Sequence, residues 1–244
     1  MKPLDAVLFD LDDTLHDDSY AFTTAAEEVA LEIAAERGLD ALALKHAYVA
    51  EAHGFWTQLT ADQLSDRLGN VRFSLWRSAL ERVGIADAEL ARRAADAYHA
   101  YRKRHFRLFP GALELLHELR SRGIKTGLVT NGMAETHREK IALLRLPEAF
   151  DAIFIADEVG LIKPDPMLFA LACTRLNSAP ARTAMVGDRY DRDIAGALSA
   201  GLQTVWMNVR HETLPLGKRP PHATVTDIPG MSDALLSIQS AGDE

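Results

Sequence analysis

Two carboxylates follow an apolar run near the N-terminus. Val7–Phe9 is apolar, and Asp10 and Asp12 come directly after it. On an extended chain, residues two apart point to the same side, so one carboxylate could attack an electrophile while the other transfers a proton. Asp13, the residue after Asp12, should point elsewhere and is assigned no chemistry. Neighbouring carboxylates repel unless protons or a cation neutralise them, so the stretch also predicts a metal ion.

Further polar residues stand at or near the ends of later apolar runs. They are, in chain order, Thr130, Asn131, Lys163, Asp188 and Asp193. Taken singly, each has a simpler interpretation, because Asp and Thr favour turns and helix N-caps, and an Asp in a first helical turn complements the helix dipole. That interpretation does not explain the whole set. Oxygen ligands suit Mg²⁺, and a lysine with a hydroxyl suits a phosphate dianion.

Short apolar runs alternate with helical patterns along most of the chain. The runs that predict strands are 5–9, 124–130, 152–156, 183–188, 203–207 and 223–226. This alternation predicts an α/β fold with a doubly wound, mostly parallel sheet and helices on both faces. Ligands bind beyond the carboxyl ends of the strands in such sheets. The polar residues above are therefore expected to converge on one edge.

The block from about residue 20 to residue 106 has a different texture. Helical spacing recurs through it, as in Leu64, Leu68, Val71 and Leu75, and no strand pattern interrupts it. The block is predicted to fold as a separate, all-helical unit inserted after the first strand. The expected division is an α/β core of residues 1–15 and 107–244 and a helical cap of residues 16–106.

Composition limits the classes of partner and the setting. The 244 residues carry a formal net charge of -8, which disfavours nucleic acid and anionic membranes as partners. Cys173 is the single cysteine, so no intramolecular disulfide can form and a cytoplasmic setting is expected. No run resembles a signal peptide or approaches the length of a membrane span.

Four short motifs in order resemble those of a known family. They are D-L-D-D-T-L at 10–15, T-N-G at 130–132, K-P at 163–164 and G-D-x-x-x-x-D at 187–193. Together they closely resemble the haloacid dehalogenase (HAD) superfamily of hydrolases. The helical insertion after the first motif resembles that family's type 1 cap. The resemblance implies a Rossmann-like core and the phosphatase branch of the family.

The resemblance also implies which residues perform the reaction. Asp10 would be the nucleophile that forms an aspartyl-phosphate, and Asp12 would protonate the leaving alkoxide and then help to activate water. Mg²⁺ would be held by the Asp10 carboxylate, the Asp12 backbone carbonyl and Asp188. Asp193 would support the metal's waters or its ligands without binding the metal itself.

The remaining motif residues would hold the phosphoryl group and shape the loop. Thr130 and the backbone of Asn131 would hydrogen-bond the phosphoryl oxygens. Lys163 would hold the same group and offset the charge of Asp10, as phosphoryl transfer requires. Thr14 is expected to tie the turn of the first motif together by hydrogen bonding.

Two positions separate the activities known in the family. Dehalogenases lack an Asp at the position of Asp12, which therefore indicates phosphate chemistry. Sugar phosphomutases commonly carry an acidic residue where this chain has Gly187, so a phosphatase acting on a small phosphomonoester, such as a mononucleotide or a sugar phosphate, is favoured. A sugar phosphomutase remains an alternative. A non-enzymatic phospho-accepting switch is a second one, since receivers use a similar acidic cluster with Thr and Lys.

Substrate specificity is the least determined property. His16 follows the first motif and Arg189 stands beside Asp188, so both are candidates for contacting the substrate. A histidine in such a loop more often faces solvent, and many relatives carry other residues in place of Arg189. The expected partner is a small phosphorylated metabolite, and the oligomeric state, monomer or homodimer, is left open.

Overall fold

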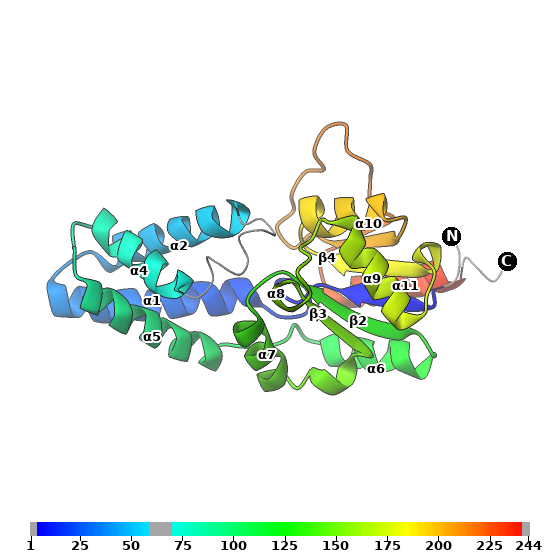
Figure 1. The fold of residues 1–244 in the computed structure, drawn as a ribbon, viewed down its shortest axis with the longest axis horizontal. Helices are drawn as coiled ribbons and strands as arrows, with labels where there is room; N and C mark the ends of the chain where they lie inside the picture. Colours follow the sequence, from blue (N-terminus) through cyan, green and yellow to red (C-terminus); the bar gives the residue numbers. More distant parts are fainter. Residues whose placement is uncertain (1–3, 59–69, 241–244) are drawn as a thin grey trace. The chain divides into compact units, whose positions relative to one another are not determined.

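The structure, a computed structural model, describes residues 4–58 and 70–240 (Figure 1). The chain divides into two compact units, Met1–Asp17 with Leu108–Glu244, and Asp18–Arg107. The boundaries expected from the sequence, 15/16 and 106/107, lie two residues and one residue away from these. No helix in the described part of the chain is both long and apolar enough to cross a membrane.

The first unit is built on a sheet of six parallel strands in the order β3-β2-β1-β4-β5-β6. The strands are β1 (Ala6–Phe9), β2 (Lys125–Thr130), β3 (Ala152–Ile155), β4 (Thr183–Gly187), β5 (Gln203–Met207) and β6 (Ala223–Val225). Every residue of β1, β4 and β5 is buried, as expected for strands covered on both faces. The predicted doubly wound α/β fold is confirmed.

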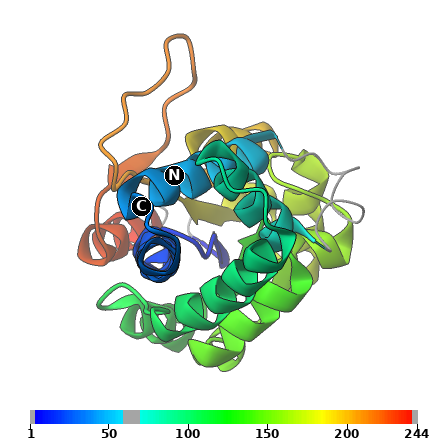
Figure 2. The ribbon, with the colours of Figure 1, turned by 90° about the vertical axis from the view of Figure 1, so that its left-hand side faces the viewer.

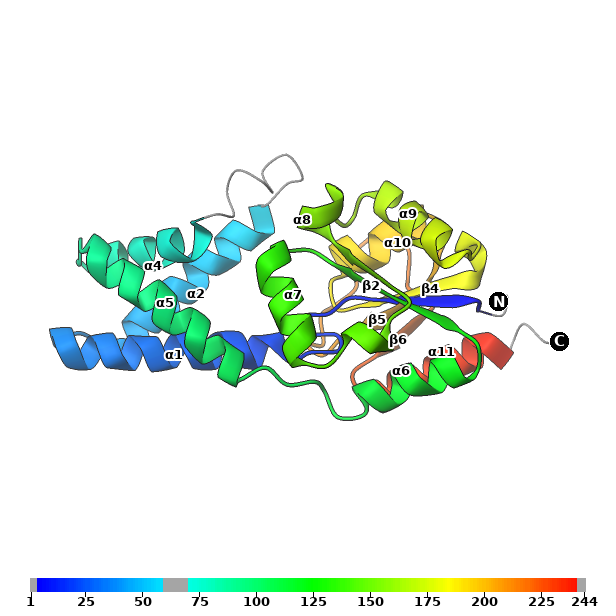
Figure 3. The same ribbon diagram turned by 60° about the horizontal axis from the view of Figure 1, so that its bottom comes forward.

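Helices cover both faces of this sheet, with α9 and α10 on one side and α6 and α11 on the other (Figure 3). The helices of this unit are α6 (Ala112–Ser121), α7 (Ala134–Leu143), α8 (Ala156–Val159), α9 (Pro166–Leu176), α10 (Ala195–Ser199) and α11 (Ile228–Ser240). Short 3-10 turns span Pro147–Ala149 and Pro180–Arg182, and a π-helical turn spans Tyr190–Ile194.

Local signals in the sequence fix where α9 begins and ends. Asp165 caps the helix by accepting the backbone N–H of Met167 at 2.9 Å, and Pro166 fills the first position, where no backbone N–H is needed. The helix stops at Asn177, which adopts the left-handed conformation. The loop that carries Lys163 therefore runs straight into a well-capped helix.

The second unit is all-helical over its described residues (Figure 2). Its helices are α1 (Asp18–Arg37), α2 (Ala41–Gln58), α4 (Val71–Arg82) and α5 (Ala88–Arg104). Tyr48 stacks on Trp76 with ring centroids 4.1 Å apart and Tyr98 packs against both, so these aromatic rings form core. The expected helical pattern at Val71 and Leu75 falls on α4, whereas Leu64 and Leu68 lie outside the described residues.

Candidate active site

The carboxyl ends of three adjacent strands bring polar side chains to one edge of the sheet. Asp10 follows β1 and its backbone N–H donates to Val186 O at 2.9 Å, which continues the pairing with β4. Thr130 is the last residue of β2, and Asp188 follows β4. All three side chains are buried, with at most 6% of each residue exposed. Parallel pairing therefore produces the convergence that the sequence predicted.

Lys163 lies among these carboxylates. Its Nζ is 2.6 Å from Asp10 Oδ1 and 2.7 Å from Asp193 Oδ1, and the residue is 3% exposed. Asn131 fixes the lysine's backbone, because its Nδ2 donates to Lys163 O at 3.0 Å and its Oδ1 accepts the Lys163 N–H at 2.9 Å. The Asn131 side chain thus ties the loop after β2 to the loop that carries Lys163. Lys163 is therefore held at its backbone by Asn131 and at its ammonium group by the two carboxylates.

The carboxylates of Asp10, Asp188 and Asp193 form a cluster that could hold a metal ion. One oxygen from each lies within 4.8 Å of the others, and all three residues are buried. The set expected from the sequence used the Asp12 backbone with Asp10 and Asp188, and placed Asp193 behind them. The structure adds the carboxylate of Asp193 to the same cluster.

Gly187 explains how Asp193 comes so close. A Cβ atom at position 187 would lie 2.3 Å from Asp193 Cγ, so only glycine leaves room for this carboxylate. The carboxylate is fixed there because its Oδ2 accepts the backbone N–H of Arg189 at 2.9 Å. An acidic side chain at position 187, which the family's sugar phosphomutases commonly carry, would not fit this arrangement.

Burial and mutual repulsion perturb the ionisation of this cluster. The pKa of Asp10 is raised from 3.8 to about 7, chiefly by burial; Lys163 opposes this shift, and Asp193 and Asp12 add to it. Burial raises the pKa of Asp188 well above its usual range, and the charges of Asp10 and Asp193 raise it further. Burial alone would lower the pKa of Lys163, but Asp10 and Asp193 outweigh it and raise that pKa. One lysine does not neutralise three buried carboxylates.

These shifts predict how the stability of the metal-free protein depends on pH. Between pH 3.8 and about 7 the folded protein keeps a proton on Asp10 that the unfolded chain releases, so this residue's contribution to the free energy of unfolding falls as the pH rises. Asp10→Asn should remove that loss. In urea unfolding with a chelator, the unfolding free energy of the variant relative to that of wild type should rise by a few kcal/mol from about pH 4 to about pH 8. A difference that does not change with pH would contradict the prediction.

Two residues of α7 that sequence reasoning missed lie against Asp12. Lys140 is completely buried, and its Nζ is 2.5 Å from Asp12 Oδ1. His137 Nε2 is 3.5 Å from Asp12 Oδ2, and its Nδ1 is 3.1 Å from Met133 O. The two residues are three apart and so share one face of α7, a helix that begins just beyond the end of β2. That spacing was the signal in the sequence that could have identified them. Asp12, whose side chain is 28% exposed, is thus held in a defined position.

Arg210 is a further residue that sequence reasoning missed. It follows β5 by three residues and its Nη2 lies 2.8 Å from both Asp188 Oδ2 and Asp13 Oδ2. The sequence assigned Asp13 no chemistry and expected it to point away from Asp10 and Asp12; in the structure its carboxylate lies against Arg210. Asp13 adopts the left-handed conformation, with φ of 57°, and its carboxylate shares a guanidinium with Asp188. The signal was the position of Arg210 at the carboxyl end of a strand.

Three other predicted residues are Thr14, His16 and Arg189, and the first two are placed differently from expectation. Thr14 Oγ1 is buried and makes no hydrogen bond within the described residues; only its backbone N–H contributes to the turn, donating to Leu11 O at 3.4 Å. His16 is fully buried rather than solvent-facing, and its backbone forms isolated β-bridges with Asp12 and Leu108. Arg189 directs its guanidinium to Asp191, at 3.2 and 3.3 Å.

Known proteins are similar to this chain over most of its length. A family model for haloacid dehalogenase-like hydrolases matches residues 4–201. The chain is 41% identical over 140 residues to the phosphoserine phosphatase of Thermus thermophilus, covering 57% of this chain and 55% of that protein. It is 31% identical over 249 residues to the human N-acylneuraminate-9-phosphatase, covering 96% and 94%. The solved HAD phosphatase from Thermococcus onnurineus matches with a TM-score of 0.67 at 26% identity, covering 96% of this chain and 98% of that one.

Proposed function

Because the chain belongs to the haloacid dehalogenase-like hydrolases and is a phosphoric monoester hydrolase of that family, we propose that it cleaves a small phosphomonoester with Mg²⁺ through an aspartyl-phosphate on Asp10. The observation that carries the proposal is Lys163 buried between Asp10 and Asp193, beside Asp188. A lysine within a carboxylate cluster of this kind suits a phosphate dianion together with a divalent cation.

The residues present fit a magnesium ion. Asp10, Asp188 and Asp193 supply only oxygen donors, and their charge exceeds that of the one lysine between them. Asp10 and Asp188 would hold the ion with the backbone carbonyl of Asp12, and Asp193 would support them. When bound, Mg²⁺ neutralises charge on the transferring phosphoryl group.

The protein's own groups then divide the reaction into two steps. Asp10 attacks phosphorus, the bond to the leaving oxygen breaks, and Asp12 gives that oxygen a proton. Water next attacks the aspartyl-phosphate and gives its proton to Asp12, which releases inorganic phosphate and restores Asp10. Thr130, the Asn131 backbone and Lys163 hold the phosphoryl oxygens through both steps.

Lys140 and His137 support the part assigned to Asp12. A proton donor must stay within hydrogen-bonding reach of the leaving oxygen, and the contacts of Lys140 and His137 hold this carboxylate in one place. Asp12 is also more exposed than Asp10, with side-chain exposures of 28% and 9%. That difference suits a group that meets a leaving group and then water.

The helical unit Asp18–Arg107 is assigned the role of the substrate-selecting cap. The relatives act on unlike molecules by name, a phosphoserine and an N-acylneuraminate 9-phosphate, so the shared chemistry is a small phosphorylated metabolite. A mononucleotide or a sugar phosphate is the class to screen first. Of the two specificity candidates, Arg189 has a partly exposed side chain, whereas His16 is fully buried.

Phosphate release from a generic aryl phosphate tests the proposal. Wild-type protein should release inorganic phosphate with Mg²⁺ present, lose that activity after chelation, and regain it when Mg²⁺ is added back, because the buried carboxylates otherwise repel the substrate. Full turnover in chelator would contradict the metal dependence. Transfer between isomeric sugar phosphates far above the rate of phosphate release would instead identify a mutase.

A further inference from the structure

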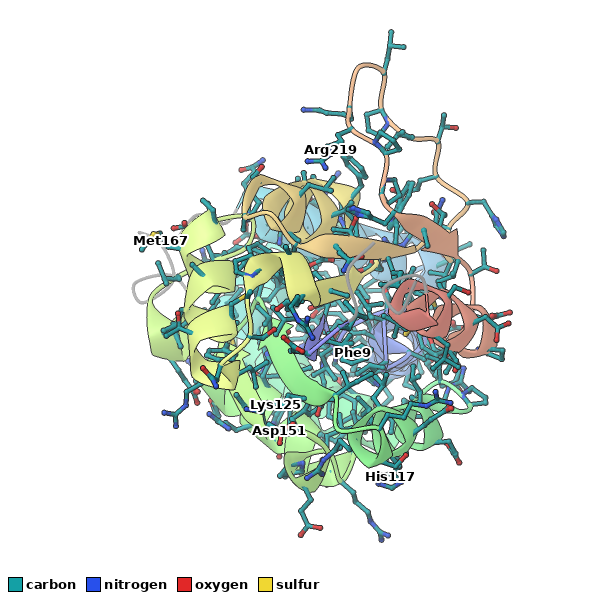
Figure 4. All side chains as sticks on the ribbon, turned by 90° about the vertical axis from the view of Figure 1, so that its right-hand side faces the viewer. Phe9, His117, Lys125, Asp151, Met167 and Arg219 are labelled. Atoms are coloured by element: carbon teal, nitrogen blue, oxygen red, sulfur yellow. The ribbon has the colours of Figure 1, made fainter. Side chains whose placement is uncertain are left out.

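The turn that follows β5 presents Arg210 in a fixed position. The Asn208 side chain closes this turn, since its Nδ2 donates to Glu212 O at 2.9 Å and its Oδ1 accepts the Glu212 N–H at 2.8 Å. The Asn208 backbone N–H donates to Val225 O at 2.7 Å, which anchors the turn to β6. Beyond it the chain forms a loop that projects away from the sheet and returns past Arg219, whose backbone O accepts a hydrogen bond from the Tyr190 hydroxyl at 2.6 Å (Figure 4). Arg210 thus stands on the anchored base of a long loop.

One nitrogen of Arg210 bridges two carboxylates from different loops. Nη2 is 2.8 Å from Asp13 Oδ2 and 2.8 Å from Asp188 Oδ2, and the two Asp side chains are only 13% and 5% exposed. Asp13 lies in the turn that follows β1, and Asp188 lies at the end of β4. The guanidinium therefore ties the proposed metal ligand Asp188 to the loop that also carries Asp10 and Asp12.

Charge distribution within the described cluster indicates why Asp188 needs this partner. Lys163 is in contact with Asp10 and Asp193, at 2.6 and 2.7 Å, whereas the cation in contact with Asp188 is Arg210. A buried carboxylate without a fixed partner turns away from like charges or takes up a proton. A single guanidinium bond uses one oxygen of Asp188 and leaves the other for a ligand.

We propose that Arg210, held by Asp13, is a positioning residue for the metal site: it fixes the carboxylate of Asp188 in the orientation in which that residue binds the cation. The inference rests on the proposed function, which makes Asp188 a metal ligand. Arg210 itself neither binds the cation nor touches the substrate. Its effect is on metal affinity, which is measured without turnover.

Calorimetric titration of the metal-free protein with Mg²⁺ alone tests the inference. Arg210→Ala should weaken Mg²⁺ binding by about 10- to 100-fold, the usual cost of removing a group that orients a metal ligand. Arg210→Lys keeps the charge but loses the planar guanidinium, so it should also weaken binding. Asp13→Asn should weaken binding in the same direction and by less. Asn tolerates the left-handed conformation of position 13, so the Asp13→Asn variant still tests the inference if the Arg210 variants fail to fold.

Glu212→Gln is the matched control. Glu212 Oε1 is 3.9 Å from Arg210 Nη1, and the Glu212 side chain is half-exposed. Like Asp13→Asn, this variant removes one negative charge beside Arg210, but it leaves the bridge between Asp13 and Asp188 intact. Its Mg²⁺ affinity should equal that of wild type. The inference assigns Arg210 a geometric effect on Asp188. If wild type and Arg210→Ala bound Mg²⁺ with equal affinity, the inference would be overturned while the proposed function would stand. Tighter binding by Arg210→Ala would also overturn it, because Arg210 would then be a competing cation. No Mg²⁺ binding by wild type would overturn the proposed function and this inference with it.

Discussion

Asp10→Asn is expected to lower phosphate release by roughly 10⁴-fold or more, the scale of effect when a nucleophile is removed. The amide has nearly the shape of the carboxylate but cannot form the phospho-enzyme. The structure gives a reason to expect a folded variant. Asp10 is buried near Asp193 and Asp188, and the loss of its charge relieves repulsion while Lys163 keeps its contact with Asp193.

Three measurements on Asp10→Asn separate lost chemistry from lost structure. Steady-state phosphate release gives the activity, urea unfolding in chelator gives stability, and acid-quenched mass spectrometry detects the phosphorylated protein. The variant should show no phospho-enzyme and, above about pH 7, at least wild-type stability in chelator. The control is Asp165→Asn, since Asn caps α9 as well as Asp and leaves activity unchanged. Turnover near the wild-type rate in Asp10→Asn would show that Asp10 is not the nucleophile.

Lys163→Met is expected to reduce both activity and stability. Phosphate release should fall by about 10²- to 10³-fold, as when a charge-stabilising donor is removed from an active site. The metal-free protein should lose about 3–5 kcal/mol of unfolding free energy, because Asp10 and Asp193 would remain buried without the ammonium between them. The loss should be smaller at acidic pH, where protons can replace the ammonium, and Mg²⁺ should recover part of it.

Urea unfolding at about pH 5 and about pH 8, with Mg²⁺ and with chelator, measures these changes in the free energy of unfolding. The control is Lys125→Met, at the opposite end of β2, where Nζ donates to Leu176 O at 3.0 Å. That variant should lose no more than about 1 kcal/mol and keep full activity. A Lys163→Met protein as stable as wild type at alkaline pH in chelator would refute the assigned electrostatic role.

The sequence was enough to predict the sheet because the strand signals are local. Each of the six strand runs is bounded by turn residues or by polar groups, and the parallel pairing of the first five then follows from the helices between them. The same logic brings Asp10, Thr130, Lys163 and Asp188 to one edge, since each lies at or shortly after the carboxyl end of a strand. The family resemblance is likewise confirmed.

The partners of these residues could not be predicted, because they depend on packing between distant segments. Lys140 lies 128 residues from Asp12, and a helical lysine is ordinarily expected on the surface. Arg210 meets Asp13 across 197 residues, through a turn whose geometry depends on Asn208. His16 is buried in a segment whose backbone forms isolated β-bridges with Asp12 and Leu108, and no side-chain pattern in the sequence indicates those bridges.

The contact between Gly187 and Asp193 has an evolutionary consequence. Any side chain at position 187 would place its Cβ 2.3 Å from Asp193 Cγ, so the two positions can change only together. A lineage that acquired the acidic residue typical of sugar phosphomutases at position 187 would first have to displace a carboxylate from the cluster around Lys163. In the proposed mechanism, where Asp193 supports the metal ligands beside Lys163, the intermediate sequence would lose phosphatase activity before it gained another activity. This pair therefore acts as a mutational barrier between two chemistries that share one fold.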